Sequence, residues 1–184
     1  MSRGRVAAVC IADRTGVPKH AVFEVELMEN RGVAGDAHAG PGHRQVSLLA
    51  AEAVALMAAK LGRRLAPGAF GENVLVAGLD LCGVKVGDHV RLGPAEVEVT
   101  QIGKECHSRC AIYHAAGDCI MPREGVFGRV VRGGPLRAGD AAAVVPAPAP
   151  GGRGGGAGGD ARGDAGGDAR GDARGDAGGH DGAT

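Results

Sequence analysis

The composition of this chain changes abruptly near Pro146, and the change confines folding to the residues before it. From Gly151 to Thr184, 15 of 34 residues are glycine, and the others are mostly Ala, Asp and Arg. A segment with no apolar side chain larger than that of Ala cannot offset the entropy of ordering its backbone. We therefore expect residues 1–145 to form one domain, and residues 146–184 to form a Pro/Ala lead-in followed by a disordered tail rich in Gly, Asp, Arg and Ala.

The charges of the chain are balanced, with 21 Lys and Arg residues against 21 Asp and Glu residues. The absence of a net charge argues against a nucleic-acid partner held by bulk charge, and an aromatic content of 2% leaves little for base stacking. No apolar run approaches the roughly 18–20 residues of a membrane span, and the first apolar run is interrupted at Asp13, which is unlike a signal peptide. We therefore expect a cytoplasmic protein without a membrane partner, whose cysteines stay reduced.

Short strand-like runs dominate residues 1–145. The clearest of them places apolar residues at alternate positions, which is the period of a half-buried strand. The runs are Val6–Ile11, Val22–Leu27, Asn73–Gly78, Asp88–Gly93, Ala95–Ile102 and Ala141–Val145. Many short strands with a single helix favour a mostly β fold, closed or half-closed as a barrel, over a parallel α/β sheet, which needs a helix after each strand.

One segment, from Ser47 to Gly62, has helical spacing instead. Its Leu and Met residues recur three to four positions apart, which predicts an amphipathic helix packed on the core. Ser47 is the predicted N-cap, and Gly62 is the predicted stop. Lys60 suits the negative C-terminal end of the helix.

Two glycine-rich loops carry polar residues outside these elements. The first, residues 32–47, delivers Asp36, His38, His43, Arg44 and Gln45 to the start of the predicted helix, where backbone N–H groups suit an anionic ligand. The alternative is an ordinary polar loop in which Asp36 caps neighbouring amides. The second loop, residues 67–74, presents two polar residues in what is otherwise a turn before a strand. The candidates of the two loops are His43, Arg44, Gln45, Glu72 and Asn73.

The chemically densest stretch, residues 100–130, contains three of the five cysteines. With a histidine they have the residue types of a Cys3His zinc site, although the spacing is looser than in most structural zinc sites. The alternative is one reactive thiolate at Cys106, because three nearby basic side chains favour the ionised sulfur. The residues concerned are Cys106, Cys110, Cys119, Lys104, His107, Arg109 and His114. The other cysteines, Cys10 and Cys82, lie in apolar runs and are expected to pack as small hydrophobic residues.

Several motifs together resemble the MOSC domain, the module named after the C-terminal part of molybdenum-cofactor sulfurases. They are GDAHAGPGHRQVSLL (35–49), PGAFGENV (67–74), VKVGDHVRLG (84–93), EVTQIGKECHSRCAIY (98–113) and GDCIMPREGVFGRVVRGGPLRAGD (117–140). The resemblance runs in matching order from about Val6 to Val145 and is greatest to the small stand-alone bacterial members. It implies a mostly β fold, a distorted β-barrel with one clear helix and a few short ones.

The resemblance also implies a site. Cys106 matches the cysteine that, in family members, ligates the molybdenum of the pterin cofactor or carries sulfur to it. Many relatives have a proline–arginine element before this cysteine, whereas this chain has IGKEC, so Lys104 has to supply the positive charge. The further cofactor-binding candidates are His43, Arg44, Gln45, Asn73, His107 and Arg123.

Two functional classes follow from the resemblance. One is an enzyme, either a molybdenum-dependent reductase of N-hydroxylated compounds or a sulfur transferase in cofactor sulfuration and maturation. The other is a non-catalytic carrier of sulfur or cofactor. The chain is too short to include a pyridoxal-phosphate desulfurase domain, so the expected partners are molybdenum cofactor and either a separate cysteine desulfurase or an electron-donor protein. A zinc-stabilised interaction domain is the remaining alternative.

Overall fold

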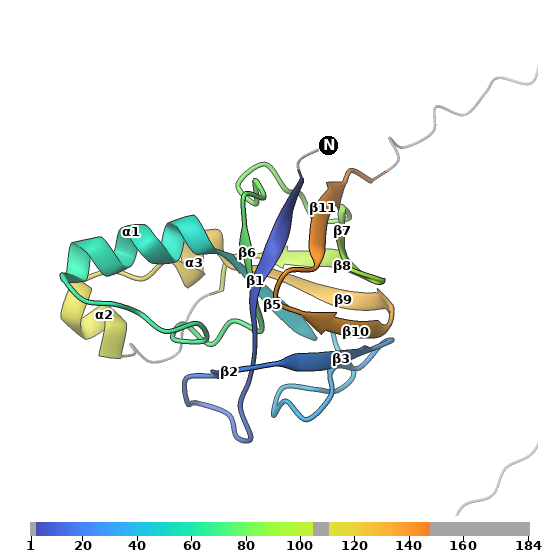
Figure 1. Ribbon diagram of the computed structural model, residues 1–184, viewed down its shortest axis with the longest axis horizontal. Helices are drawn as coiled ribbons and strands as arrows, with labels where there is room; N and C mark the ends of the chain where they lie inside the picture. The colour runs from blue at the N-terminus through green and yellow to red at the C-terminus, as the bar shows by residue number, and fades with distance from the viewer. Residues whose placement is uncertain (1–2, 105–110, 148–184) are drawn as a thin grey trace, which may run out of the picture. The chain divides into compact units, whose positions relative to one another are not determined.

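The computed structural model describes residues 3–104 and 111–147 of the chain, and within them lie eleven strands and three helices (Figure 1). In chain order they are β1 (Arg3–Ile11), β2 (His20–Val22), β3 (Glu24–Met28), β4 (Gly32–Val33), β5 (Val46–Ala50), α1 (Ala51–Leu61), β6 (Val74–Ala77), β7 (His89–Leu92), β8 (Ala95–Ile102), α2 (Ala111–Ala116), α3 (Met121–Glu124), β9 (Val126–Arg132), β10 (Gly134–Arg137) and β11 (Ala141–Val145). The predicted boundary after residue 145 coincides with the end of β11, but the predicted tail lies outside the described residues.

Seven of the strands form a closed β-barrel. Their order around the barrel is β11-β7-β8-β9-β5-β6-β1, and the pairing of β1 with β11 closes the ring. All neighbours in the ring are antiparallel except β5 and β6, which are parallel. A parallel pair requires a crossover connection, and α1 provides it. The barrel, with one longer helix and two short ones, confirms the fold class predicted from the sequence.

Four shorter strands lie outside the ring. β2 pairs with β1, while β10, β3 and β4 form a separate three-stranded sheet. These strands hold the ends of two loops, residues 12–19 between β1 and β2 and residues 34–45 between β4 and β5. A backbone hydrogen bond of 2.8 Å from the N–H of Ala37 to the carbonyl of Ala12 joins the two loops. The loops are therefore fixed beside each other at the edge of the barrel.

Two apolar clusters stabilise the barrel. Every buried side chain of the interior cluster is Val, Leu or Ala, and Leu48 is among those with no exposed surface. The second cluster lies between α1 and strands β1, β5 and β6, and it includes Cys10, Leu49 and Leu75. Strands β5 and β6 are thus buried on both faces, which explains why their sequences are continuously apolar instead of alternating.

The helix begins later than its sequence predicts. Ser47 lies in β5 and is not a helix N-cap, while α1 begins at Ala51 after Ala50, which provides no side-chain cap. The prediction was wrong because β5 pairs with both β6 and β9. These tertiary hydrogen bonds and the burial of both faces override the local helical spacing.

The C-terminal end of α1 confirms its prediction. Lys60 lies in the last turn, and Gly62 has a φ of 63°, the left-handed conformation that favours glycine at a helix end. The apolar stripe is only partly as predicted, since Met57 is buried but Leu56 is 75% exposed. No helix within the two described ranges is long and apolar enough to span a bilayer.

The cysteines in apolar runs have different environments. Cys10 in β1 is completely buried, and burial, assisted by the charge of Glu72, raises the pKa of its thiol to about 12. Cys82 is exposed, because its backbone N–H donates to Asp80 Oδ1 at 3.0 Å in a turn that faces solvent. The expectation of a packed hydrophobic residue is confirmed for Cys10 and wrong for Cys82.

Candidate functional site

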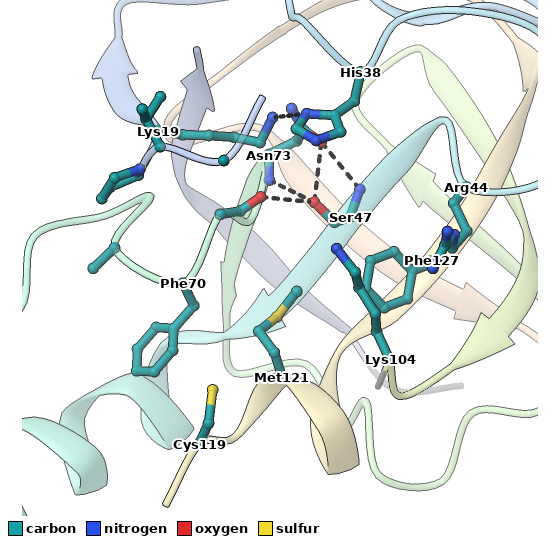
Figure 2. A pocket seen from close by; sticks show the side chains of 15 residues that line it. Lys19, His38, Arg44, Ser47, Phe70, Asn73, Lys104, Cys119, Met121 and Phe127 are labelled. Atoms are coloured by element: carbon teal, nitrogen blue, oxygen red, sulfur yellow. Dashed lines mark hydrogen bonds between the residues drawn. The ribbon is translucent and has the colours of Figure 1, made fainter. Parts of the chain in front are cut away.

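A pocket of about 460 Å³ is built from segments that are far apart in the sequence (Figure 2). Its walls come from the β1–β2 loop, the β4–β5 loop, strand β5, and the loop between α1 and β6. Lys104, which follows β8, and the segment from Cys119 into β9 complete them. Sites for small molecules commonly have volumes of about 300–1,000 Å³. The pocket therefore has the size of a cofactor or substrate site.

Ser47 and Asn73 form a polar side of the pocket and are joined by reciprocal hydrogen bonds. The backbone N–H and the hydroxyl of Ser47 donate to Asn73 Oδ1 at 3.2 and 3.0 Å, and the N–H of Asn73 donates to Ser47 Oγ at 3.0 Å. Asn73 Nδ2 also donates to the carbonyl oxygen of Cys10 at 3.2 Å. These bonds connect β5, the start of β6 and β1, so both side chains have fixed positions.

The turn before Asn73 is held by a buried carboxylate. Glu72 has no exposed surface, and its two oxygens accept the backbone N–H groups of Gly68 at 2.7 Å and Phe70 at 3.1 Å. Burial raises the pKa of the Glu72 carboxyl, although the backbone donors act in the opposite direction. Glu72 thereby fixes the turn that brings Phe70 and Gly71 to the pocket wall.

A buried ion pair lies at another edge of the pocket. The side chains of Lys19 and Asp36 are 2% and 0% exposed, and Lys19 Nζ lies 2.5 and 2.7 Å from the two carboxylate oxygens. Asp36 also accepts the backbone N–H groups of Ala12 at 3.0 Å and His38 at 3.1 Å, as the polar-loop alternative predicted. Burial alone would raise the pKa of Asp36, but the Lys19 ammonium and these amides outweigh it and lower the pKa.

His38 extends this pair toward the pocket. Its Nδ1 lies 3.3 Å from Lys19 Nζ, and its side chain is 44% exposed (Figure 2). Burial and the charge of Lys19, with a smaller contribution from Lys104, lower the pKa of His38, while Asp36 opposes them. His38 is therefore neutral at pH 7.

Two further cationic side chains, Arg44 and Lys104, line the same pocket. Within residues 3–104 and 111–147, neither side chain is part of an ion pair. Positive charges that line a pocket attract anionic groups such as phosphate. The pocket also has an apolar lining, which includes Phe70, Phe127 and two sulfur-containing residues, Cys119 and Met121.

The structure brings together some of the candidate residues and separates others. Arg44, Asn73 and Lys104 line the pocket as a group. His43 faces β8 instead: its Nε2 lies 3.1 Å from Gln101 Oε1, and its carbonyl accepts a hydrogen bond from the hydroxyl of Thr100. Because the chain continues from His43 into β5 and not into a helix, the expected anion site at a helix start is wrong.

Gln45 and Arg123 have roles away from the pocket wall. Gln45 is buried, and its Oε1 accepts the backbone N–H of Val130 in β9 at 3.0 Å. Arg123 is paired with Asp118, with two nitrogen–oxygen distances of 2.7 and 3.0 Å. This pairing raises the pKa of Arg123 and lowers that of Asp118 to about 2. Lys60 of α1 also lies 3.9 Å from Asp118, so the cluster links the segment before α3 to the end of α1.

Cys106, His107 and Cys110 lie outside the described residues, so their roles stay predictions. The residues on both sides of them, Lys104 and Cys119, line the pocket. Among the residues described, no group of three or more His, Cys, Asp and Glu side chains is arranged to hold a metal ion.

Sequence reasoning missed several residues of the pocket. No sequence pattern indicates that Lys19 belongs to the site, because a single lysine in a loop does not reveal that its partner, Asp36, lies 17 positions later. The sequence places His38 in the first glycine-rich loop but does not single it out as a cofactor ligand. The apolar wall could have been found only by placing Phe70 and Phe127 on neighbouring segments, which requires the tertiary structure.

Comparisons with known proteins agree with this architecture. A protein-family model described as "MOSC domain" matches residues 34–143. Among solved structures, the YUAD protein from Bacillus subtilis has a TM-score of 0.65 and 20% sequence identity, covering 78% of this chain and 96% of that one. YiiM from Geobacillus stearothermophilus has a TM-score of 0.60 and 20% identity, covering 77% of this chain and 75% of that one. YiiM from Escherichia coli has a TM-score of 0.55 and 23% identity, covering 79% and 70%.

At these identities, the similar structures establish the fold and not the activity. No curated protein matches the sequence. The family model nevertheless covers more than half of the chain and includes the β4–β5 loop, β5, the turn at Glu72 and the segments on both sides of Cys106. The barrel, the motifs and this match lead to one conclusion, that the chain belongs to the MOSC domain family.

Proposed function

We propose that this chain binds molybdenum cofactor in the pocket and that the thiolate of Cys106 ligates the molybdenum or carries sulfur to it. In this proposal the protein acts in the cytoplasm, either in sulfuration and maturation of the cofactor or as a molybdenum-dependent reductase of N-hydroxylated compounds. The observation that carries the proposal is the position of Lys104. It lines the pocket together with Arg44, and Cys106 follows it by two residues.

Chain connectivity supports the assignment of Cys106. Cys106 is two residues from Lys104 in the sequence, and two residues span at most about 7 Å between Cα atoms. Cys119, on the other side of the same segment, also lines the pocket. A positive charge such as that of Lys104 favours the ionised form of a nearby thiol, and the thiolate is the form that ligates metals or accepts sulfur.

The chemistry of the pocket fits the cofactor, which combines a pterin, a phosphate and a dithiolene-held metal. Arg44 and Lys104 offer positive charge to the phosphate. His38 and Ser47 offer polar atoms to the edge of the pterin, and Phe70 with Phe127 provides apolar surface for its rings. When bound, the cofactor supplies a metal for two-electron oxygen-atom chemistry, and a thiolate is a soft ligand suited to it.

The other residues of the site hold this arrangement in place. Asn73 uses its amide to connect Ser47 and Cys10, so its main task is to position the pocket wall. Glu72 fixes the turn of Phe70, and the Lys19–Asp36 pair fixes the two loops on the other side. His43, Gln45 and Arg123, which the sequence suggested as cofactor ligands, contact Gln101, Val130 and Asp118 respectively, and their role toward the cofactor stays a prediction.

Metal and pterin analysis of the purified full-length protein tests the proposal. The wild type, produced in cells supplied with molybdate, should contain molybdenum and pterin, and Cys106→Ser should lose the molybdenum while its melting temperature stays unchanged. Cys82→Ser is the matched control, because this thiol is exposed in a turn outside the pocket, and it should retain the metal.

Two results would replace the proposal. Retention of molybdenum by Cys106→Ser would exclude that thiolate as the ligand. If Cys106→Ser, Cys110→Ser and Cys119→Ser all lose stoichiometric zinc and unfold together, the protein is a zinc-stabilised interaction domain, because the binding energy of a structural zinc is also folding energy.

The enzyme and the carrier are separated by turnover. Cofactor-loaded protein supplied with a chemical electron donor should reduce an amidoxime if it is a reductase, and an electron-donor protein is then its partner. A carrier should hold the cofactor without turnover and should gain a persulfide on Cys106 after incubation with a cysteine desulfurase and cysteine. If the protein binds the cofactor but shows neither activity, cofactor binding alone is its function.

A further inference from the structure

We propose that the buried Lys19–Asp36 pair is a positioning device that fixes His38 as the neutral imidazole with its proton on Nε2, so that His38 donates a hydrogen bond to the pocket's ligand. The tautomer of His38 is a property of the protein alone. The part of the inference that concerns the ligand rests on the proposed binding of molybdenum cofactor.

The first step is that Asp36 has little remaining capacity to accept hydrogen bonds. Its Oδ1 accepts from Lys19 Nζ at 2.5 Å and from the N–H of Ala12 at 3.0 Å, and its Oδ2 accepts from Lys19 Nζ at 2.7 Å and from the N–H of His38 at 3.1 Å. The carboxylate has no exposed surface. Its charge is therefore balanced by Lys19, and its oxygens are occupied.

The second step concerns His38 Nδ1, which has two neighbours. Lys19 Nζ lies 3.3 Å away and Asp36 Oδ2 lies 3.5 Å away. An ammonium has three donors and no acceptor, so a proton on Nδ1 would point at a group that cannot accept it. Without that proton, Nδ1 accepts from the Lys19 ammonium, and Figure 2 shows the two groups directed at each other. The ring proton is then on Nε2.

The third step is that the site disfavours the doubly protonated ring. The charged groups that act on His38 are Lys19, Asp36 and Lys104, and Arg44 lines the same pocket. The carboxylate is already paired with Lys19, and among the described residues no other carboxylate pairs with Lys104 or Arg44. A second proton on the imidazole would also require Nδ1 to face an ammonium. The neutral form is the one that fits.

The consequence is a directional donor in the pocket wall. The side chain of His38 is 44% exposed, and the pocket is the space it lines. With Nδ1 engaged, Nε2–H is its remaining polar group, and it suits an acceptor such as a carbonyl, ring-nitrogen or oxyanion atom. A ligand that places a donor there leaves two donors facing each other, which costs binding energy.

Long-range ¹H–¹⁵N NMR of the full-length, cofactor-free protein with labelled histidine tests the tautomer. We expect one fixed tautomer for His38 at pH 7, protonated on Nε2 and with Nδ1 accepting a hydrogen bond. The exposed His20 is the reference in the same spectrum, since an imidazole in water exchanges between tautomers. Signals averaged like those of His20, a proton on Nδ1, or a doubly protonated ring would overturn the proposal.

A variant locates the cause of the fixed tautomer. Lys19→Met should remove the hydrogen bond to Nδ1 and leave Asp36 Oδ2, 3.5 Å away, as the acceptor that faces it, so the His38 signals should shift toward tautomer exchange or toward a proton on Nδ1. If this variant does not fold, the wild-type spectrum decides the matter by itself. A folded variant with an unchanged His38 spectrum would show that Lys19 does not control the tautomer.

Two substitutions of His38 test the donor role through retention of cofactor, measured as pterin and molybdenum per protein. The side-chain amide of Gln places an N–H near the position of Nε2, whereas that of Asn reaches only the position of Nδ1. His38→Gln should therefore retain cofactor nearly as well as wild type, and His38→Asn should bind about tenfold more weakly, as expected for one lost hydrogen bond.

Failure of the proposed function and failure of the inference about His38 give different results. If the wild type holds no cofactor, the proposed function fails, and the spectrum alone decides the inference about His38. If the wild type holds cofactor and both variants hold it equally well, the donor role is wrong although the proposed function stands.

Discussion

The interior of the barrel and the pocket at its edge are built from different kinds of residue. The buried members of the interior cluster are all Val, Leu or Ala. By contrast, five of the seven buried polar or charged residues in the described part of the chain line the pocket or hydrogen-bond to residues that line it, namely Lys19, Asp36, Ser47, Glu72 and Asn73. The interior is stabilised by removal of apolar surface from water, while the pocket depends on a network of hydrogen bonds.

The contrast shows where this protein gives up stability for a defined site. Burying an ion pair or a carboxylate costs desolvation energy, and good hydrogen-bond geometry offsets this cost without a net gain. Apolar residues of the same volume would therefore often give an equally stable fold. No buried side-chain nitrogen or oxygen in the described part of the chain lacks a hydrogen-bond partner. The polar network is therefore complete, and loss of one member leaves its partner buried without compensation.

The largest effect is expected where the polar network is broken. Lys19→Met leaves the fully buried Asp36 without its counter-ion, and we expect a loss of about 3–5 kcal/mol in the free energy of unfolding, measured by urea denaturation. The double variant Lys19→Met/Asp36→Leu should recover part of this loss, because it removes the uncompensated charge. A double variant less stable than the single one would contradict this view of the pair.

A smaller loss is expected in the barrel interior. Leu48→Ala removes a side chain with no exposed surface, and we expect it to cost about 3 kcal/mol while the spectrum of His38 stays unchanged. Leu56→Ala is the matched control on the exposed surface of α1, where the same substitution should change stability by less than about 0.5 kcal/mol. Equal losses at the two positions would show that the burial pattern is wrong.

Acid should lower the free energy of unfolding through the buried carboxylate at the pocket and not through the apolar barrel interior. We expect this effect to be smaller than that of Lys19→Met or Leu48→Ala. The pKa of Asp36 in the folded protein is below its ordinary value of 3.8, so the unfolded chain takes up this proton first. The contribution of Asp36 to stability is therefore present above pH 3.8 and is lost as the pH falls through the folded-state pKa. Urea denaturation at several pH values should show a flatter decline below pH 4 in the Lys19→Met/Asp36→Leu variant than in wild type.

Asp118→Asn is the control for the acid experiment. This carboxylate also has a lowered pKa, but its side chain is 34% exposed and its partner Arg123 is 57% exposed, so the pair is largely open to solvent. Exposed ion pairs contribute little to stability, so the acid decline of this variant should match that of wild type. If stability declined less steeply with acid in Asp118→Asn than in Lys19→Met/Asp36→Leu, Asp118 and not Asp36 would be the carboxylate that couples stability to pH.

The smallest effect is expected from removal of the C-terminal residues. Deleting residues 151–184 should leave the melting temperature and the cofactor content unchanged, because these residues have no apolar side chain larger than Ala to add to a core. A deletion that starts at Ala147 should lower the melting temperature slightly, since the N–H of Ala147 donates to Asp88 Oδ1 at 2.9 Å. A large fall with the shorter deletion would show that those residues contribute to the fold.

The class of fold could be predicted because it depends on local patterns. The alternation in residues 95–102 appears as β8, whose buried positions are Ala95, Val97 and Val99. The prediction failed at β5, where both faces are buried. Its continuous apolar sequence has no period of two, and it runs directly into α1.

The site could be predicted only in part. Arg44, Asn73 and Lys104 were candidates from three loops, and the fold brings all three to one pocket. His43 and Gln45 flank Arg44 in the sequence but contact β8 and β9 instead of lining the pocket. The Arg123–Asp118 pair likewise depends on a contact that no motif indicates.

The sequence by itself determined the class of fold and the family. These properties follow from composition, periodicity and motifs, each of which is contained in contiguous residues. Only the tertiary structure decided that Lys19, Asp36 and His38 act together, because the ion pair requires two loops joined at Ala12 and Ala37. It also decided which polar side chains face the pocket, since that depends on strand pairing and on burial in three dimensions.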